Sequence, residues 1–365
     1  PTGTLLGVPA VAARLDGVLS ADGLAAVAAE PTIPLEWEPG GDVALGGMLR
    51  ARFGPEIADR VADPLLGGVY AGRVDALGLR ATIPALATAL DAGAPSLTAA
   101  ASGLAGPTAA DGPVFGAVDG GYRVLLDALT AAARPELRLG TTVRALARTG
   151  TGWRLTLGPV PAPEHLDVDA VALALPAPAK LLDDVVPAAA AAAGRIELAS
   201  SVVVALAYRA ADVAALPATS GVLVAADEPL SIKAVTHTST KWGHLAPDAT
   251  DGLVRLRASL GRFGEAGTLQ VDDATLVARV RADLAALHAV TAAPAAVHVQ
   301  RWGGGLPQYA VGHVATVAAL EDAVAGEPRL AVAGAALHGV GVPACVGTAR
   351  AAAERIAASL TAGRA

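Results

Sequence analysis

The sequence has one cysteine among its 365 residues, Cys345, and only three lysines among its 27 basic residues. A single cysteine excludes an internal disulfide framework and fits a reducing compartment, so we expect a cytoplasmic protein. No charged segment followed by an apolar one opens the sequence given, so it shows no secretory signal. Aromatic residues make up 3% of the chain and hydrophobic residues 53%, which predicts a core of small aliphatic side chains.

An excess of positive charge is also missing. The formal net charge is -7 and the isoelectric point is near 5.5. Nucleic-acid binding is therefore unsupported, because it requires a basic face, and no polybasic segment suits a membrane surface. The uncharged stretch 331–349 is long enough to span a bilayer, but glycines and prolines interrupt it. We expect no transmembrane segment, while peripheral membrane contact and the oligomeric state stay open.

Motifs of several enzyme classes are absent. The seven histidines never stand four residues apart and no Cys-x-x-Cys pair occurs, so no metal site is expected. Neither a Gly-x-Ser-x-Gly nucleophile motif nor a Walker phosphate loop is found. The sequence given also lacks the Gly-x-Gly-x-x-Gly loop that holds the pyrophosphate of a dinucleotide.

The C-terminal region has the pattern of a ligand loop. An apolar run over 330–336, a glycine-rich turn up to Cys345 and an amphipathic segment over 346–360 predict strand, tight loop and helix. Gly339 and Gly341 lack the Cβ atoms that would keep a flat ring away from the backbone, and the helix would direct free N–H groups at the ligand. An anion, or a ring that becomes anionic when reduced, would suit this loop. The alternative is an ordinary strand-to-helix turn.

The rest of the chain predicts a mixed α/β protein with more than one subdomain, because its length exceeds the usual limit of a single core. Before residue 92 it is expected to be helical, with Ser20 and Asp42 as N-caps and a helix start at Pro55. Loops are expected over 1–9 and 61–72, and a flexible linker over 92–110.

Later residues alternate between strand and helix patterns. Strands are predicted over 136–139, 142–148, 153–157, 170–176, 198–208, 222–225, 231–236, 253–260 and 297–302. Helices are predicted over 272–287 and 314–325, and a turn over 303–307.

Four segments combine unusual residues in a fixed order. They read Asp-Pro-Leu-Leu-Gly-Gly-Val-Tyr-Ala-Gly (63–72), Lys-Trp-Gly-His (241–244), Pro-Gln-Tyr-Ala-Val-Gly-His (307–313) and Gly-Val-Gly-Val-Pro-Ala-Cys (339–345). Together they resemble the FAD-dependent protoporphyrinogen and coproporphyrinogen III oxidase family of bacterial type. The resemblance covers residues 2–357, although the family usually has proline where Gly243 stands.

The resemblance implies the FAD/NAD(P)-binding flavin oxidase fold, an α/β (α+β mixed) architecture. It divides the chain into four segments: a helical subdomain lining the substrate pocket (1–107), the second segment of the FAD-binding domain (108–180), an antiparallel substrate-binding sheet (181–298) and the C-terminal segment of the FAD-binding domain (299–365). The family places a dinucleotide-binding unit before the segment that opens this sequence. We therefore expect the sequence given to be N-terminally truncated and, by itself, poorly soluble and colourless.

The family's motifs carry cofactor-binding residues over to this sequence. Val143 is similar to the valine whose backbone meets the adenine side of FAD, and Trp302 to the tryptophan beside the flavin. Val340, Gly341 and Val342 are similar to the family's loop under the pyrimidine edge of the flavin, and Gly334 and Gly339 are expected to bind the cofactor as well. The structural alternatives are a strand valine, a core tryptophan and the glycines of a plain turn.

Substrate-binding residues are expected at Gly68, Tyr70, Trp242 and Tyr309. Trp242 could instead cover a sheet face. Propionate groups of a porphyrinogen need positive charge at the rim of the pocket, which Arg73, Lys241 and Arg257 could supply if they are more than solvated surface charges. No catalytic side chain and no metal is implied, because the chemistry is centred on the flavin.

The activity implied is oxidation of coproporphyrinogen III to coproporphyrin III in haem biosynthesis. Flavin N5 takes a hydride from a methylene bridge, and O2 then reoxidises the flavin to give hydrogen peroxide. Alternatives are a protoporphyrinogen IX oxidase, a flavin amine oxidase or desaturase, which would share the C-terminal loop, and a truncated non-catalytic chain.

Overall fold

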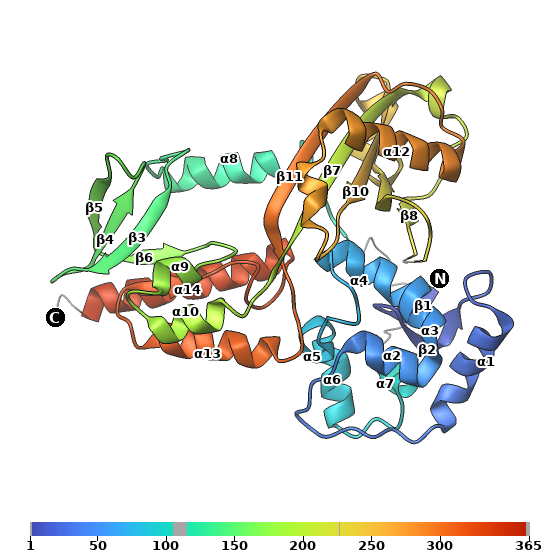
Figure 1. Cartoon of the computed structure of the whole chain (residues 1–365), viewed down its shortest axis with the longest axis horizontal. Helices are drawn as coiled ribbons and strands as arrows, with labels where there is room; N and C mark the ends of the chain where they lie inside the picture. The colour runs from blue at the N-terminus through green and yellow to red at the C-terminus, as the bar shows by residue number, and fades with distance from the viewer. Residues whose placement is uncertain (1, 105–114, 226, 363–365) are drawn as a thin grey trace. The chain divides into compact units, whose positions relative to one another are not determined.

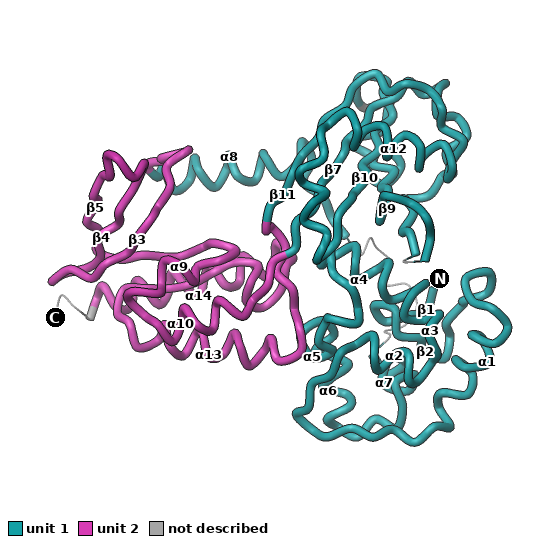
Figure 2. Tube along the Cα trace, viewed as in Figure 1, with its two compact units in different colours: residues 1–135, 199–303 teal, residues 136–198, 304–365 magenta. Residues whose placement is uncertain are grey.

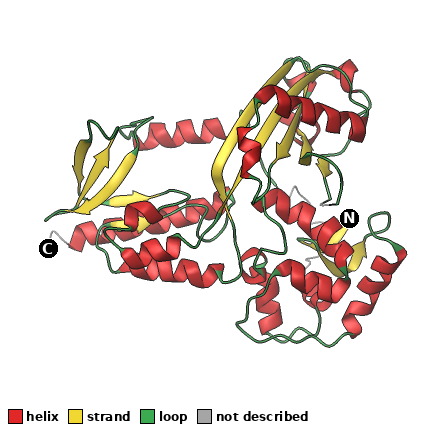
Figure 3. Cartoon of the chain, in the orientation of Figure 1, coloured by secondary structure: helices red, strands yellow, loops and turns green. Residues whose placement is uncertain are grey.

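The computed structural model describes residues 2–104, 115–225 and 227–362 (Figure 1). The chain forms two compact units (Figure 2): unit 1 comprises residues 1–135 and 199–303, and unit 2 comprises residues 136–198 and 304–365. Helices and strands occur in both units (Figure 3), which confirms the predicted mixed class. The functional division into four segments remains a prediction, and we keep it as a proposal.

The first part of unit 1 is a β-hairpin followed by short helices. The hairpin consists of β1 (Thr2–Leu5) and β2 (Val8–Arg14), where a turn alone was predicted. The helices are α1 (Ala21–Ala29), η1 (Glu30–Thr32), α2 (Leu45–Phe53), α3 (Pro55–Ile57), η2 (Ala58–Ala62), α4 (Asp63–Tyr70), α5 (Leu79–Thr82), α6 (Pro84–Asp91), α7 (Leu97–Leu104) and α8 (Tyr122–Ala133).

Of the two predicted N-caps, Ser20 is confirmed and Asp42 is wrong. Ser20 caps α1 as predicted, because its hydroxyl accepts the N–H of Gly23 at 3.1 Å. Asp42 does not cap α2, whose N-cap is Ala44. Its carboxylate instead accepts the N–H of Arg80 at 3.0 Å, so a tertiary contact uses the side chain that local pattern assigned to the cap.

A buried ion pair ties these helices together. The Glu30 carboxylate accepts from Arg52 Nη2 at 2.6 Å and from the N–H groups of Leu97 and Thr98 at 2.9 and 3.1 Å. Both charged side chains are buried. Burial opposes ionisation, but these hydrogen bonds outweigh it and lower the pKa of Glu30. The carboxylate thereby joins α2 to the N-terminal end of α7.

Two segments predicted without regular structure are helical. Residues 63–70 form α4, where a loop was predicted, and residues 97–104 form α7 inside the predicted linker; its residues 105–110 lie outside the described part of the chain. A Cβ on Gly67 would stand 3.0 Å from Arg262 Nη1 and from the Gly72 oxygen. This glycine therefore marks close packing of a helix rather than a loop.

The second part of unit 1 is a five-stranded sheet in the order β11-β7-β10-β9-β8. The elements are β7 (Leu198–Arg209), η3 (Ala210–Val213), β8 (Gly221–Leu223), β9 (Ile232–His237), α11 (Thr238–Lys241), η4 (Gly243–Leu245), η5 (Pro247–Ala249), β10 (Leu253–Leu260), η6 (Ala266–Gln270), α12 (Asp273–His288) and β11 (Ala296–Pro307). β7 and β10, β10 and β9, and β9 and β8 pair antiparallel. The predicted turn over 303–307 is wrong, because β11 continues through it.

One face of this sheet packs on α12. Alternate β7 residues such as Val204 and Leu206 share a buried cluster with Leu256 of β10 and with Leu276 and Val280 of α12. Because side chains alternate across a strand, the residues between them lie on the opposite face. The sheet therefore has a filled face and an open face.

Up to residue 362, where the description ends, unit 2 has a parallel pair of strands, a separate three-stranded antiparallel sheet and four helices. Its elements are β3 (Val143–Arg148), β4 (Trp153–Leu157), β5 (Glu164–Val168), β6 (Val171–Leu173), α9 (Ala179–Leu182), α10 (Pro187–Ala193), α13 (His313–Ala325), β12 (Leu330–Val332) and α14 (Val342–Ala362). The predicted strand over 136–139 does not form, and Leu137 and Leu139 are exposed. Within the described ranges, no helix is both long and apolar enough to cross a bilayer.

Candidate functional site

The C-terminal glycine loop joins β12 to α14, so the predicted order of strand, loop and helix is confirmed. Gly334 has φ +117° and Gly339 has φ +145°, a region that favours glycine. A Cβ on Gly339 would also stand only 2.8 Å from the Cβ of Ala344. Gly341 adopts no such φ, and a Cβ there would meet only Pro343 Cδ at 3.8 Å, an ordinary contact, so its lack of a side chain serves to leave the loop surface accessible.

The Pro-Gln-Tyr and Gly-His motif holds this loop. The Tyr309 hydroxyl donates to the Ala335 oxygen at 2.8 Å, and Nε2 of His313 lies 3.2 Å from the Leu337 oxygen. Since a carbonyl only accepts, His313 carries the proton on Nε2. The two rings stack at 3.9 Å and both residues are buried. The structure shows that Tyr309 contacts the loop. Its contact with a substrate stays a prediction.

The exposed side of the loop fits the edge of an electron-rich ring. Among the described residues, no group accepts the backbone N–H of Val342 or Ala344, at the start of a 21-residue helix, and Pro343 has no N–H. Gly341, Val342 and Pro343 are exposed. Unused donors and the positive end of the helix dipole favour a ring that gains negative charge. The residues present therefore fit the pyrimidine edge of a flavin.

The two other predicted cofactor residues lie in different units. Val143 begins β3 in unit 2, pairs with Leu157 and is 36% exposed. Trp302 belongs to β11 in unit 1 and is 54% exposed. The preceding Arg301 donates to the Leu269 oxygen at 2.8 Å, and Leu269 packs against the buried cluster between the sheet and α12. Because neighbours on a strand alternate, Trp302 lies on the open face of the sheet.

Besides Trp302, that open face carries small residues of β7 and two arginines of β10, Arg255 and Arg257. Arg257 of β10 pairs with Ala205 of β7 on one side and Thr236 of β9 on the other. A pocket of about 310 Å³ on this face is lined by Ala205, Arg257 and His298, among others. Arg257, predicted as a rim residue, thus lies on the same face as Trp302.

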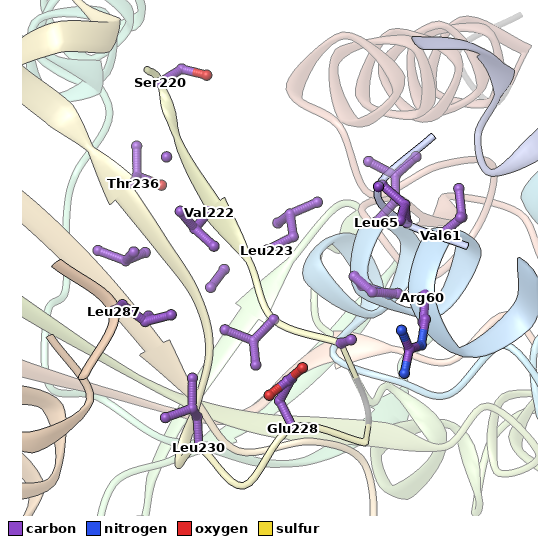
Figure 4. A pocket seen from close by; sticks show the side chains of 18 of the residues that line it. Arg60, Val61, Leu65, Ser220, Val222, Leu223, Glu228, Leu230, Thr236 and Leu287 are labelled. Carbon is purple, nitrogen blue, oxygen red and sulfur yellow. The ribbon is translucent and has the colours of Figure 1, made fainter. Parts of the chain in front are cut away.

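A larger cavity, of about 890 Å³, lies within unit 1 between β8, β9 and the helical segment η2–α4. Figure 4 shows side chains of β8, such as Leu223, facing Val61 and Leu65 of the helical segment. Its lining combines apolar residues with polar ones, among them the cations Arg60 and Lys241 and the anion Glu228. The volume lies within the range of sites for cofactors and drug-sized ligands.

None of the predicted substrate residues of unit 1 lines this cavity, and Gly68 has a close approach to a lining residue. Gly68 follows the lining residues on α4, and a Cβ there would meet Leu223 Cδ2 at 3.7 Å. Tyr70 is 7% exposed, and burial raises its pKa. Trp242 is half-buried, and the Nζ of Lys241 stands 5.2 Å from the centre of its ring.

Sequence reasoning missed several residues here. Arg60 lines the cavity and donates to Asp227 Oδ2 at 3.1 Å, but no motif marks it. His313 was seen in its motif without a role, and only its contact with the loop reveals one. In the described part of the chain, no cluster of three or more His, Cys, Asp or Glu residues could hold a metal ion.

Comparisons with known proteins agree with this geometry. No family model matches the sequence. The chain is 43% identical over 363 residues to the coproporphyrinogen III oxidase of Mycobacterium leprae (strain TN), which covers 99% of this chain and 77% of that protein. The coproporphyrinogen III oxidase of Bacillus subtilis (strain 168) is 28% identical over 364 residues, covering 96% of this chain and 75% of the relative.

Solved structures show the same fold. The structure assigned as a protoporphyrinogen oxidase from Exiguobacterium sp. 255-15 matches with a TM-score of 0.80 and 30% identity, covering 99% of this chain and 77% of that one. Cyclohexylamine oxidase from Brevibacterium oxydans IH-35A matches with a TM-score of 0.61 at 12% identity, covering 98% and 78%. The second likeness concerns the fold alone. The predicted flavin oxidase fold is confirmed.

Proposed function

Because this chain belongs to the coproporphyrinogen III oxidase family, we propose that it oxidises coproporphyrinogen III to coproporphyrin III with FAD as cofactor and O2 as electron acceptor. The observation that carries the proposal is the 43% identity to a coproporphyrinogen III oxidase over 99% of the chain. An amine oxidase is less well supported, since that likeness is limited to the fold at 12% identity.

FAD, when bound, supplies the hydride acceptor for this reaction. The chain's own contribution at that group is the glycine loop. Val342 and Ala344 offer unused N–H groups, while Tyr309 and His313 hold the loop carbonyls from behind. Such fixed donors stabilise developing negative charge without reorganising during the reaction.

In this proposal the substrate is bound by the shape and charge of the cavity, and no acidic or basic side chain has to transfer a proton. A porphyrinogen is a large, mostly apolar ring with charged arms, which suits a cavity of about 890 Å³ whose lining is part apolar and part charged. Lys241 in its lining and Arg257 on the open face of the sheet offer positive charge to the propionates. Gly68, Tyr70 and Trp242, which do not line the cavity, are still proposed to contact the substrate.

The test is an assay of the purified full-length protein, loaded with FAD and supplied with coproporphyrinogen III under air. We expect porphyrin fluorescence to rise and hydrogen peroxide to accumulate, both above a heat-inactivated control that corrects for spontaneous oxidation. A protein that retains FAD yet forms no porphyrin above this control would contradict the proposal.

A second substrate, protoporphyrinogen IX, is supported by the structural match at TM-score 0.80 to an assigned protoporphyrinogen oxidase. Coproporphyrinogen carries four propionates and protoporphyrinogen two, so rim cations should favour the former. We expect a higher kcat/KM on coproporphyrinogen III. An equal or higher value on protoporphyrinogen IX would reverse the assignment of the preferred substrate.

A further inference from the structure

A second, smaller cavity of about 100 Å³ adjoins the 890 Å³ cavity in unit 1, and Val224 and Leu230 line both. Three cations line the smaller cavity. Lys233 comes from β9, Arg262 follows the last residues of β10, and Arg73 lies beyond the end of α4. The topology therefore brings three positive charges from distant parts of the sequence to one small space.

Two of these cations are buried and have N–H donors that make no hydrogen bond to the described part of the protein. Lys233 is 4% exposed, and its Nζ donates to the Gly261 oxygen at 2.8 Å. Arg262 is 8% exposed, and its Nη1 has no hydrogen-bond partner among the described residues. Asp63 Oδ2 lies 3.7 Å from this atom and forms an ion pair with it, but the distance is too long for a hydrogen bond. Gly67 leaves room for this guanidinium, because a Cβ there would stand 3.0 Å from Nη1.

The buried carboxylate near the cluster is already engaged. Asp63 is 2% exposed, and its oxygens accept from Arg73 Nη1 at 3.1 Å and from the Val74 N–H at 3.0 Å. At 3.7 Å Asp63 also forms an ion pair with Arg262, without a hydrogen bond, so this one carboxylate balances two arginines. Lys233 has no ion-pair partner among the described residues. An unused donor on a buried charge is costly unless a ligand or water satisfies it.

Two exposed carboxylates also line the cavity and reduce its positive charge. Glu265 accepts the N–H of Arg262 at 3.1 Å, and Glu228 lies on the side shared with the larger cavity. Neither makes a side-chain ion pair with Lys233 or Arg262 within the described residues. Burial, followed by repulsion from Arg262, lowers the pKa of Lys233 to about 8, so the lysine is still mainly charged at neutral pH.

We propose that the cavity lined by Arg73, Lys233 and Arg262 is a carboxylate-binding site that takes one propionate arm of the tetrapyrrole. The assignment to the substrate rests on the proposed function. A volume of about 100 Å³ admits a carboxylate arm and excludes a macrocycle, which the adjoining 890 Å³ cavity can hold. The same chemistry would bind a small free carboxylate.

The test compares ligands that differ in carboxylate number, without using turnover. Binding of coproporphyrin III and of protoporphyrin IX is measured by porphyrin fluorescence, and binding of propionate by thermal shift. Lys233→Met should weaken coproporphyrin III binding about tenfold or more, the usual range for one charge-assisted hydrogen bond. Arg262→Met should do the same, while Arg262→Lys should recover part of the loss. Lys180→Met, at an exposed lysine in unit 2, is the control, and circular dichroism checks folding.

The outcomes separate this site from the proposed function. Weaker porphyrin binding in Lys233→Met and Arg262→Met, with partial recovery in Arg262→Lys, supports the arm assignment. If the wild type binds no porphyrin but propionate raises its melting temperature in a way that Lys233→Met abolishes, the carboxylate site stands and the substrate arm is overturned. If Lys233→Met binds coproporphyrin III and propionate as the wild type does, the cavity holds water alone and the proposal is overturned.

Discussion

Replacing Lys233 by methionine should remove a pH dependence from the stability of the protein. Burial lowers the pKa of this lysine from 10.5 to about 8 in the folded state. The unfolded chain keeps the proton up to its ordinary pKa. Between the two values the unfolded state therefore binds more protons, and stability rises with pH. A shift of roughly 2.5 units at about 1.36 kcal/mol each corresponds to ~3 kcal/mol.

The pH slope is a better measure than stability at one pH. At pH 7, Lys233→Met removes a buried charge, which stabilises, but leaves the Gly261 oxygen without its donor, which costs about 1–3 kcal/mol. These terms offset each other. The difference in free energy of unfolding, wild type minus variant, should instead be flat below pH 8 and rise by ~3 kcal/mol towards pH 10.5.

The assay is urea unfolding of the wild type, Lys233→Met and Lys180→Met at intervals from pH 7 to pH 10. Lys180 is exposed, so its variant should follow the wild type in parallel. Tyrosines and other groups that titrate in this range are common to all three proteins and cancel. Parallel curves for Lys233→Met and the wild type would show that Lys233 is hydrated in the folded protein, and the reasoning about its burial would fail.

Three further predictions concern stability and cofactor binding. Removing either partner of the buried pair, by Glu30→Gln or Arg52→Met, should lower the free energy of unfolding by about 3–5 kcal/mol, and the double variant by less than the sum, measured in urea. Burial and a neighbouring histidine lower the pKa of His288; its unfolded form takes up a proton first as pH falls, so stability should drop below about pH 6.5, and His288→Gln should flatten that drop. Gly339→Ala should lower the content of bound FAD, measured by flavin absorbance, whereas Gly347→Ala, whose Cβ meets open space, should not.

Elements with a buried face were predictable from their own sequence. The strand predicted over 253–260 is β10, and the strand predicted over 198–208 differs from β7 by one residue. The helix predicted over 272–287 is α12, with Asp272 as its N-cap, where the carboxylate accepts the Thr275 N–H at 2.9 Å. In each case the periodicity of the apolar residues and the capping side chain act locally.

The errors arose where distant residues decide local structure. α7 forms in a stretch with linker composition because the Glu30 carboxylate, more than 60 residues earlier, accepts its first N–H groups. α4 tolerates Gly67, which would cost about 1 kcal/mol in an isolated helix, because Arg262 occupies the space of its missing side chain. Neither partner can be identified from the segment itself.

The candidate site likewise has a part that the sequence predicts and a part that only the folded structure reveals. The glycine loop was predictable because its order of apolar run, glycines and amphipathic segment is continuous in the sequence. Its support by Tyr309 and His313, and the joining of Lys233 with Arg262, depend on how strands and helices pack. Residues that come together only in the folded chain form no motif with a recognisable spacing in the sequence.

The sheet of unit 1 shows how stability and the location of functional groups are linked. Leu256 and Leu260 of β10 are buried against α12, and their alternation requires Arg257 to lie on the open face. A register slip of one residue would exchange the faces and bury Arg257 without a partner. Burying an unpaired charge costs several kcal/mol, so the apolar pattern that builds the core also fixes the arginine on the face that Trp302 shares.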